Sequence, residues 1–268
     1  MDSDKKAVHD FWERAACGEQ LYLSDTDARA YREHARRRYT LEPYITAFAD
    51  FPAARGKRVL EIGVGLGADH QCFAESGARL WGIDLTQRAV DHARRRLKHF
   101  HLQSNLAVGD AENLPFTDES FDVVYSWGVL HHSPGTPRAV AEVHRVLDRG
   151  GVAKIMIYHT WSLVGYMLWV RYALLRLRPW TSLAEIYARY LESPGTKAYS
   201  RSQAKRLFAA FDRVNIQIEL THGDLLESEA GQRHQGALLS LARRLWPRAL
   251  LRKIARGHGL FMLITAVK

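Results

Sequence analysis

The chain has 268 residues, long enough for one large domain with additions, and its hydrophobic fraction of 47% is ordinary for a globular protein. Two cysteines, Cys17 and Cys72, are too few for a disulfide framework, and the polar N-terminus does not resemble a signal peptide, so we expect a reduced, cytoplasmic compartment. The net charge of +9 is compatible with an acidic partner, a membrane surface or nucleic acid, but a generally arginine-rich composition explains it more simply, and no specific nucleic-acid partner is expected.

Residues 1–55 are predicted to form an N-terminal helical lid. The segment from Ala28 to Tyr39 is crowded with Arg and Tyr, and a second helical segment runs from Tyr44 to Phe51. Two interpretations of the first segment stay open. It is either a solvated basic face or a lid that folds over a ligand.

Residues 56–158 alternate strictly between strand and helix and form the predicted cofactor-binding core. The expected strands are 58–62, 79–83, 106–108, 121–127 and 152–158. Thr86 is predicted to cap the second helix of this core, and the basic run from Arg94 to Lys98 suits the negative end of that helix's dipole. Thr136 is predicted to cap the last helix of the core, with Pro137 as its first residue.

The alternation breaks at residues 159–199, an aromatic segment predicted to be a cap insertion. Residues 200–268 begin with a capping box at Ser200 and Gln203 and contain the last two expected strands, 214–220 and 260–267. A basic insertion at 221–257 separates these strands and carries Arg243, Arg244, Arg248, Arg252 and Lys253. The predicted fold is α/β: a doubly wound, mainly parallel, seven-stranded Rossmann-like sheet with an antiparallel last strand and helical cap insertions.

The most informative stretch is Glu61 to Gly67, where an apolar strand ends in a carboxylate and a glycine-rich turn leads into a helix. Glycines let the backbone approach a ligand closely, and ligands of open α/β sheets bind at this point. The pattern Gly63-x-Gly65-x-x-Ala68 also fits a dinucleotide site, with Asp84 about 20 residues further on to bind ribose hydroxyls. An NAD(P)-dependent oxidoreductase therefore stays an alternative.

Two carboxylates favour a different ligand. Glu61 precedes the first glycine, where it would repel a pyrophosphate but attract a cationic amino group. Asp110 follows the third expected strand, where it can accept a hydrogen bond from the exocyclic amine of a base. A ligand with an amine, a ribose and an adenine but no phosphate fits S-adenosylmethionine.

The sequence resembles the class I S-adenosylmethionine-dependent methyltransferases, within them the branch of the ubiquinone and menaquinone C-methyltransferases. The resemblance covers roughly residues 57–158 and rests on motifs at 61–67, 82–85, 110–116, 121–124, 128–132 and 145–151, with Arg149 where the family usually has Pro. It implies that the glycine turn holds the methionine moiety, that the second and third strands end at the ribose and the adenine, and that the fourth strand faces the methionine group. The implied cofactor residues are Glu61, Gly63, Gly65, Gly67, Asp84, Leu85, Asp110, Ala111, Glu112, Ser126 and Trp127.

Methyl transfer from a sulfonium is an in-line displacement, so positioning of the acceptor supplies much of the rate, and a hydroxyl, amine or carbon acid can also need a general base. Candidates at the ends of the fourth and fifth strands are His131, His132, Tyr158 and His159. Adjacent residues of a chain point in different directions, so His131 and His132 are expected to have different roles. No metal site is predicted, because the histidines lack carboxylate or cysteine partners at ligand spacing.

The aromatic cap insertion favours an apolar or aromatic small molecule as the methyl acceptor. Expected contacts are Tyr158, His159, Trp161, Tyr166 and Trp169. The insertions also mix arginines with apolar residues, so a membrane-associated methyltransferase of a lipid or quinone, with peripheral membrane contact, and a homodimer face stay open as alternatives.

Overall fold

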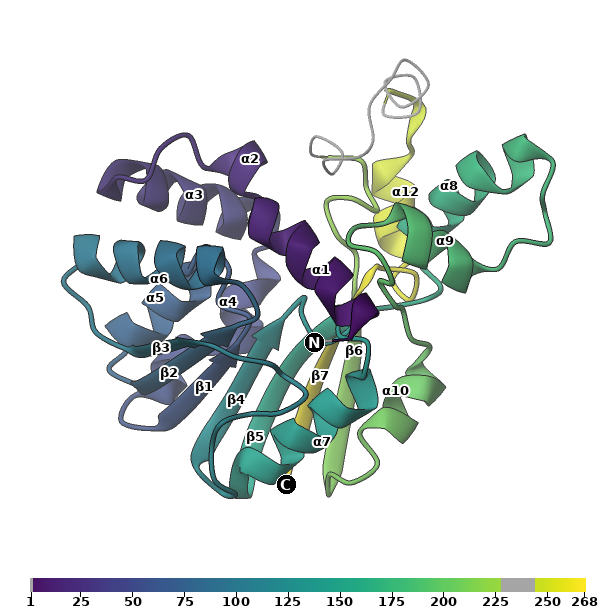
Figure 1. Cartoon of the computed structure of the whole chain (residues 1–268). Helices are drawn as coiled ribbons and strands as arrows, with labels where there is room; N and C mark the ends of the chain where they lie inside the picture. The colour runs from purple at the N-terminus through teal and green to yellow at the C-terminus, as the bar shows by residue number, and fades with distance from the viewer. Residues whose placement is uncertain (1, 228–243) are drawn as a thin grey trace.

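Seven strands form a single sheet in the computed structural model, which describes residues 2–227 and 244–268 (Figure 1). The strands are β1 (Arg58–Ile62), β2 (Arg79–Asp84), β3 (Asn105–Val108), β4 (Phe121–Trp127), β5 (Leu147–Tyr158), β6 (Arg213–Glu219) and β7 (Phe261–Val267). Their order is β3-β2-β1-β4-β5-β7-β6, and β7 runs antiparallel to both of its neighbours while the other pairs are parallel. The predicted sheet is confirmed.

Strand β5 begins earlier than the sequence predicted. The glycine pair at 150–151 has the composition of a helix end, so the expected start was residue 152. In the structure Leu147 already pairs with Phe121, and a register shift follows before Val152 pairs with Val123. The chain therefore enters the sheet directly from the preceding helix.

Helices and turns cover the two faces of the sheet in separate apolar clusters. Leu60 and Val124 face one side, where α7 (Thr136–Val146) and α10 (Arg201–Leu207) pack on them. Val59 and Val123 point to the other side, toward α4 (Tyr44–Ala49) and α5 (Ala68–Glu75). This alternation follows from the two-residue period of a strand.

The predicted helix starts are mostly correct. Thr86 caps α6 (Gln87–His99) by accepting from the backbone of Ala89, and Ser200 and Gln203 form the capping box of α10. Helix α7 differs, because Thr136 is its first residue and Gly135 takes the cap position. Among the described residues, none of the helices is both long enough and apolar enough to cross a membrane.

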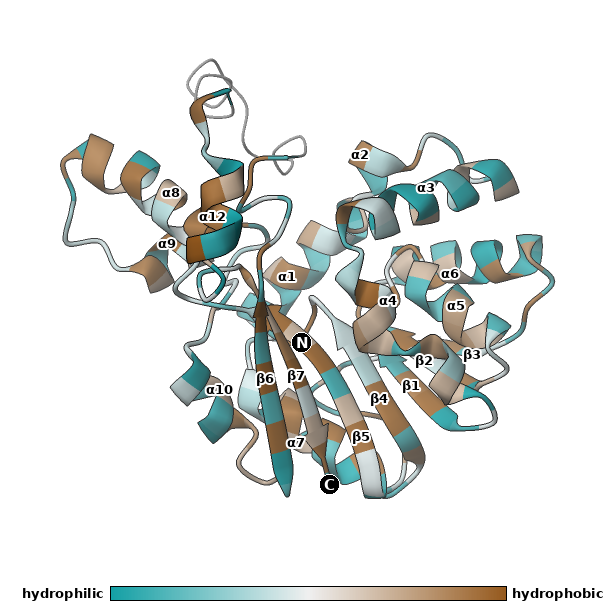
Figure 2. Ribbon diagram, turned by 180° about the vertical axis from the view of Figure 1, so that it is seen from behind, coloured by the Kyte–Doolittle hydropathy of each residue, from teal (hydrophilic) through white to brown (hydrophobic). Residues whose placement is uncertain are grey.

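Two further groups of helices lie beyond the carboxyl ends of the strands (Figure 1). The N-terminal group comprises α1 (Ser3–Arg14), α2 (Glu19–Tyr22) and α3 (Ala28–Leu41), whereas a 3-10 turn at Phe51–Ala54 packs on the face of the sheet just before β1. The second group comprises α8 (Leu163–Tyr172), a 3-10 turn at Leu174–Arg176, α9 (Leu183–Tyr190) and α12 (Arg248–Ile254). Helix α1 is the member of the N-terminal group that lies nearest the second group in both views (Figures 1 and 2). Arg243 of the predicted basic insertion is outside the described residues.

A buried carboxylate joins the second group to the sheet. Asp224 is fully buried and accepts hydrogen bonds from the backbone of Val164 at 3.1 Å, Thr221 at 2.9 Å and Leu260 at 2.8 Å. These donors lie at the start of α8, just after β6 and just before β7. One side chain thus fixes three segments that are far apart in the sequence.

Arg96 corrects the interpretation of the basic run on α6. It is fully buried instead of facing solvent at the helix end. Its guanidinium donates to the carbonyl of Leu66 at 3.1 Å, to the carbonyl of Tyr31 at 2.9 Å and to Gln71 Oε1 at 2.7 Å. Arg96 therefore ties the glycine turn to α3 of the N-terminal group.

We predict that Arg96→Met lowers the free energy of unfolding by about 2 kcal/mol. Two buried carbonyls lose their donor at about 1–3 kcal/mol each, and relief of the buried charge offsets part of that cost. Urea denaturation measures the change. Lys98→Met, at an exposed position of the same helix, is the matched control, and equal midpoints for the two variants would contradict the structural role of Arg96.

Candidate active site

A cavity of about 1010 Å³ lies at the carboxyl ends of the strands and reaches under both groups of helices. Its lining runs from Asp84 and Asp110, through Trp127 and Tyr158, to residues of α8. The volume is at the upper end of the roughly 300–1,000 Å³ range of ligand pockets. One continuous cavity can therefore hold a cofactor and a second small molecule together.

The glycine turn forms one wall of this cavity, as predicted for the methionine end. Gly63, Gly65 and Gly67 all have positive φ, at 84°, 50° and 74°, which other residues rarely adopt. A Cβ at Gly63 would lie 2.1 Å from Val129 Cγ2, so there is no room for any side chain. The glycines thus bring backbone to the cavity wall, which Val64 and Leu66 of the same turn also line.

Asp84 is held rigidly at the end of β2. Its carboxylate accepts from the backbone of Gly65 at 3.1 Å and from both the backbone and the hydroxyl of Thr86 at 3.0 and 2.8 Å. Burial raises the pKa of this carboxyl, and these donors work in the opposite direction. With Leu85 beside it in the lining, Asp84 is placed to meet a ribose diol.

Asp110 and Ala111 line the neighbouring part of the cavity. Lys5 of α1 lies 2.6 Å from Asp110 Oδ2 and 3.0 Å from Glu112 Oε2, so the N-terminal helix closes this end. Glu112 is not part of the lining and instead accepts from Ser133 and from the backbone of Gly135. Glu112 therefore holds the start of α7 and does not face the cavity.

The other predicted cofactor residues also divide into those that line the cavity and those that do not. Glu61 and Trp127 line the cavity. Ser126 does not; it is fully buried and donates to the carbonyl of Ile62 at 2.9 Å, which fixes β4 against β1. The structure therefore brings all the predicted cofactor residues except Glu112 and Ser126 to one surface.

Glu61 is buried in a short hydrogen-bonded chain. Its Oε2 lies 2.8 Å from His70 Nδ1, and His70 Nε2 lies 2.8 Å from Ser104, whose hydroxyl donates to the carbonyl of Leu80. Because that hydroxyl proton is used, Nε2 of His70 must carry the proton donated to Ser104. Burial holds the pKa of His70 down to about 3 and raises the pKa of Glu61 well above its usual range. His70 Nδ1 then accepts a hydrogen bond from a protonated Glu61.

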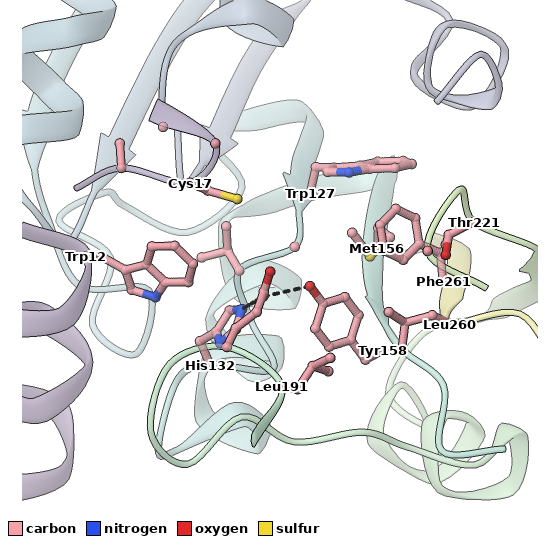
Figure 3. A pocket seen from close by; sticks show the side chains of 18 of the residues that line it. Trp12, Cys17, Trp127, His132, Met156, Tyr158, Leu191, Thr221, Leu260 and Phe261 are labelled. Carbon is pink, nitrogen blue, oxygen red and sulfur yellow. Dashed lines mark hydrogen bonds and ion pairs between the residues drawn. The ribbon is translucent and has the colours of Figure 1, made fainter. Parts of the chain in front are cut away.

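The opposite end of the cavity carries a polar cluster of His132, Tyr158 and Glu192. The Tyr158 hydroxyl donates to Glu192 Oε2 at 2.7 Å, and His132 Nε2 lies 3.2 Å from the same oxygen. Figure 3 shows the rings of His132 and Tyr158 near each other beside Leu191, with Trp12 and Trp127 further along the wall, and the two rings meet edge to face at an interplanar angle of 81°. Burial, and then Glu192, raise the pKa of Tyr158 well above its usual range, so Tyr158 keeps its proton and acts as a donor.

Two hydroxyls fix the orientation of His132. Its Nδ1 lies 2.8 Å from Ser193 Oγ and 3.1 Å from Thr196 Oγ1. The Thr196 hydroxyl donates to the carbonyl of Ser193, so it can only accept at Nδ1. Nδ1 therefore carries the proton in the neutral ring, which leaves the lone pair on Nε2 toward Glu192.

Only some of the other residues predicted to contact the methyl acceptor reach the cavity. Tyr166 lines the cavity, whereas His131, His159, Trp161 and Trp169 do not. His131 is fully buried against Tyr158 at a ring distance of 3.9 Å, and burial lowers the pKa of His131 well below its usual range. His159 contacts the carbonyl of Gly259, Trp169 donates to the carbonyl of Thr181, and Trp161 is half exposed.

Sequence reasoning missed several residues of the cavity wall. Trp12 and Cys17 come from the N-terminal group, where no motif marks them. Arg38 of α3 makes a two-pronged contact with Asp69, at 2.7 and 3.1 Å, beside the glycine turn. Glu192 lies in the cap insertion, and no spacing in the sequence connects it with His132. The one feature of the sequence that could have indicated Glu192 is its position as a carboxylate inside an aromatic insertion.

Two members of this cluster, His132 and Glu192, together with His131 have the residue types of a metal site. One ligand atom each from His131, His132 and Glu192 lies within 4.8 Å of the others. Zinc bonds of roughly 2.1 Å in a tetrahedron need ligand atoms closer together, at about 3.4 Å. Among the described residues, neither ring nitrogen of His131 has a hydrogen-bond partner. The trio would have to contract around an ion, so we treat it as a polar cluster.

Comparisons with known proteins agree with this geometry. Residues 60–155 match a protein-family model described as a methyltransferase domain. That segment contains the glycine turn, Asp84, Asp110 and His132. Fold and site together define a class I S-adenosylmethionine-dependent methyltransferase. Residues 60–155 therefore form a methyltransferase domain, in the part of the chain where the motifs predicted it.

Two curated relatives share this part of the chain. The phthiotriol/phenolphthiotriol dimycocerosates methyltransferase of Mycobacterium leprae is 43% identical over 98 residues, which are 36% of this chain and 36% of that protein. The demethylmenaquinone methyltransferase of Tropheryma whipplei (strain Twist) is 35% identical over 126 residues, 46% of this chain and 52% of that protein. The chain thus spans about a third to a half of the length of these curated relatives.

Solved structures resemble the chain over nearly all of its length. A phosphoethanolamine N-methyltransferase 2 of Haemonchus contortus, in complex with S-adenosylhomocysteine, has a TM-score of 0.63 at 20% identity and covers 97% of this chain and 60% of that chain. A SAM-dependent methyltransferase of Thermotoga maritima has a TM-score of 0.55 at 20% identity, covering 97% and 99%. At this identity the likeness shows the fold.

S-adenosylmethionine, the cofactor of this class, fits the donor set. Asp84 suits ribose hydroxyls, Asp110 suits an exocyclic amine, and Glu61 offers a carboxyl without any phosphate-binding cation beside it in the glycine turn. The dinucleotide alternative fits poorly, because a pyrophosphate would offer Glu61 no cationic partner and would hold its carboxyl in the neutral form.

We predict that S-adenosylmethionine binding releases a proton from Glu61. The free protein holds this carboxyl protonated, and a cationic ligand favours the carboxylate, so binding lowers its pKa. Affinity then rises with pH through the raised pKa of Glu61 and levels off above it. Calorimetry in buffers of different ionisation enthalpy measures the released protons. The measurements are made at about pH 5–7, so that the ligand's α-amino group (pKa about 7.7–8.0) stays charged.

Glu61→Gln is the matched control for this experiment, because the amide keeps the shape but cannot lose a proton. The variant should bind more weakly and without proton release. Proton uptake by the unmodified protein, or release that persists in Glu61→Gln, would show that another group titrates.

Proposed function

We propose that this protein transfers the methyl group of S-adenosylmethionine to an apolar or aromatic small molecule. The observation that carries the proposal is the continuity of the cavity. Asp84 and Asp110 are at one end of it, and Trp12, Tyr158 and Glu192 are at the other. A cofactor on the first set would direct its methyl group along the cavity toward the second.

Glu192 is the best-placed group to take a proton from the acceptor. It lines the cavity with its side chain 30% exposed, while the Nε2 atom of His132 is buried behind it. S-adenosylmethionine supplies a methyl group on a positively charged sulfur. As the carbon–sulfur bond breaks and the bond to the acceptor forms, the acceptor's proton would pass to Glu192. The Tyr158 hydroxyl would hold the carboxylate before this transfer, and Nε2 of His132 would accept a hydrogen bond from the protonated carboxyl after it. An acidic hydroxyl or carbon acceptor suits this arrangement.

The N-terminal helices are proposed to act as a lid. Lys5 bridges Asp110 and Glu112, and Trp12 and Cys17 complete the cavity wall from the same segment. Movement of α1 would open the cofactor end. Cys17 and Cys72 are both free thiols, which supports a reducing compartment such as the cytoplasm.

The relatives support an apolar acceptor. The names of the two curated relatives indicate methyl transfer to a phthiotriol dimycocerosate and to demethylmenaquinone. The acceptor end of this cavity is bordered by apolar and aromatic side chains such as Met156, Leu260 and Phe261 (Figure 3). A lipid-like or quinone-like acceptor is therefore preferred over a charged one.

Incubation with S-adenosylmethionine labelled in its methyl group tests the activity. We expect label in products from phenols, hydroquinones or hydroxylated lipids and none from charged amines. Product formed only from charged amines would contradict the apolar acceptor. If the protein does not bind S-adenosylmethionine in calorimetry, the proposed function is wrong as a whole.

We predict that Glu192→Gln lowers kcat by roughly 10²–10⁴, the usual contribution of a general base, while the Kd for S-adenosylmethionine stays unchanged. Single-turnover measurements separate the two quantities. Glu33→Gln, at an exposed carboxyl of α3, is the control. His132→Asn should change the pH dependence of kcat, because it removes the ring that contacts Glu192. A Glu192→Gln variant with full kcat would rule out this base.

A further inference from the structure

Seven consecutive residues at the outer end of the cap insertion are exposed although most of them are apolar. These residues, 174–180, are here called the cap tip, and they follow α8 directly. Leu175 is 62% exposed, Leu177 83% and Trp180 79%. Single exposed leucines are ordinary, but a run of this kind on one projecting turn marks an interaction site.

The cap tip is also cationic. Arg176 and Arg178 lie between its apolar residues and are exposed, and Arg171 precedes them on α8. Within residues 2–227 and 244–268, none of these three arginines has a carboxylate within 4 Å, whereas Arg38, Arg58 and Arg145 are all ion-paired. Arg171 and Arg176 lie over the ring of Tyr172, at 5.3 and 5.1 Å from its centroid, so the described part of the chain gives them an aromatic contact but no anionic partner.

A second element extends this surface. Helix α12 exposes Leu250 and Ile254 together with Lys253. The segment that follows α12 is attached to the start of α8, because the backbone of Leu163 donates to the carbonyl of His258 at 2.9 Å. In Figure 2 apolar positions colour both helices, which stand side by side clear of the sheet.

The surface is continuous with the cavity. Val170, Arg171 and Leu175 border the cavity and are themselves partly or largely exposed, and Trp246 lines it from the segment before α12. An apolar molecule that leaves a surface in contact with the cap tip would reach the Tyr158 end of the cavity without crossing water.

We propose that the cap tip and α12 bind the surface of an anionic phospholipid bilayer and that the methyl acceptor enters the cavity from that bilayer. The leucines and Trp180 would lie among the lipid chains at the interface, and the arginines would contact the phosphate layer. Alternating apolar and basic residues suit a bilayer, whereas a protein partner would need a matching acidic and apolar face. The entry route rests on the proposed function; the surface binding itself does not.

Vesicle flotation tests the binding. The full chain is mixed with vesicles of pure phosphatidylcholine and of equimolar phosphatidylcholine and phosphatidylglycerol, without cofactor or acceptor. We expect binding to the anionic vesicles that weakens with salt, because each arginine near such a surface contributes about 1 kcal/mol. Arg176→Glu/Arg178→Glu and Leu177→Ser/Trp180→Ser should each weaken the binding by roughly tenfold or more.

Lys205→Glu/Arg206→Glu on α10 is the matched control, because it changes the net charge equally at exposed positions away from the cap tip. It should bind vesicles like the unmodified chain. Equal loss in this control, no binding to anionic vesicles, or equal binding to both vesicle types would each overturn the proposal. So would light scattering that shows a dimer broken by Leu177→Ser/Trp180→Ser, because the cap tip would then be covered by a second copy.

Calorimetry with S-adenosylmethionine on the same variants keeps the two proposals distinguishable. Cap-tip variants that bind S-adenosylmethionine normally but not vesicles support the bilayer surface and confirm that the variants are folded. If the unmodified chain binds S-adenosylmethionine but no vesicles, the bilayer proposal is wrong and the proposed function stands. If it binds vesicles but no S-adenosylmethionine, the proposed function is wrong and the surface binding stands.

Discussion

The absence of side-chain space at the end of β1 is the constraint on which the rest of the site depends. Gly63 has no room for a Cβ beside Val129, and three glycines of the turn take positive φ. A turn this tight exposes backbone groups and needs support from outside itself. Arg96 gives that support by binding the carbonyl of Leu66, and it binds α3 at the same time. The glycine turn and α3 are therefore a single mechanical unit, to which α1 does not belong.

The cavity divides by polarity along its length. At the cofactor end the carboxyl groups are fixed by hydrogen-bond donors, as Asp84 is by Thr86. At the acceptor end the wall is apolar, and its polar groups are concentrated in the cluster around Glu192. An apolar wall lowers the local dielectric constant, and the electrostatic interactions at this end are stronger for that reason. This arrangement favours a neutral, apolar acceptor over one that must keep its hydration shell.

Local sequence patterns were sufficient to predict the sheet and to select a set of residues most of which line one cavity. Apolar runs that end in Glu61 or Asp84 place carboxylates at one edge of a parallel sheet, because that edge collects the carboxyl ends of the strands. The early start of β5 was missed because Gly150 and Gly151 have the composition of a helix end, while pairing with Phe121 is a tertiary effect.

The acceptor end could not be predicted to the same degree. Glu192 and His132 meet only because the cap insertion folds back over the end of β4, and no local pattern encodes that path. Trp161 and Trp169 were expected in the cavity on composition alone, yet they lie outside its wall. Arg96 was misassigned for a related reason: a basic residue in a basic run gives no sign of which one points inward.

The buried Asp224 has a consequence for the order in which the protein can assemble during synthesis. Two of its donors, Val164 and Thr221, leave the ribosome well before the third, Leu260, which precedes β7. N-terminal segments of a chain generally fold first. Strands β1 to β5 and the cofactor end can therefore form while the cap is still unanchored, and the acceptor end closes only when the final strand arrives. A nascent chain could hold its methyl donor before it can recognise anything to methylate.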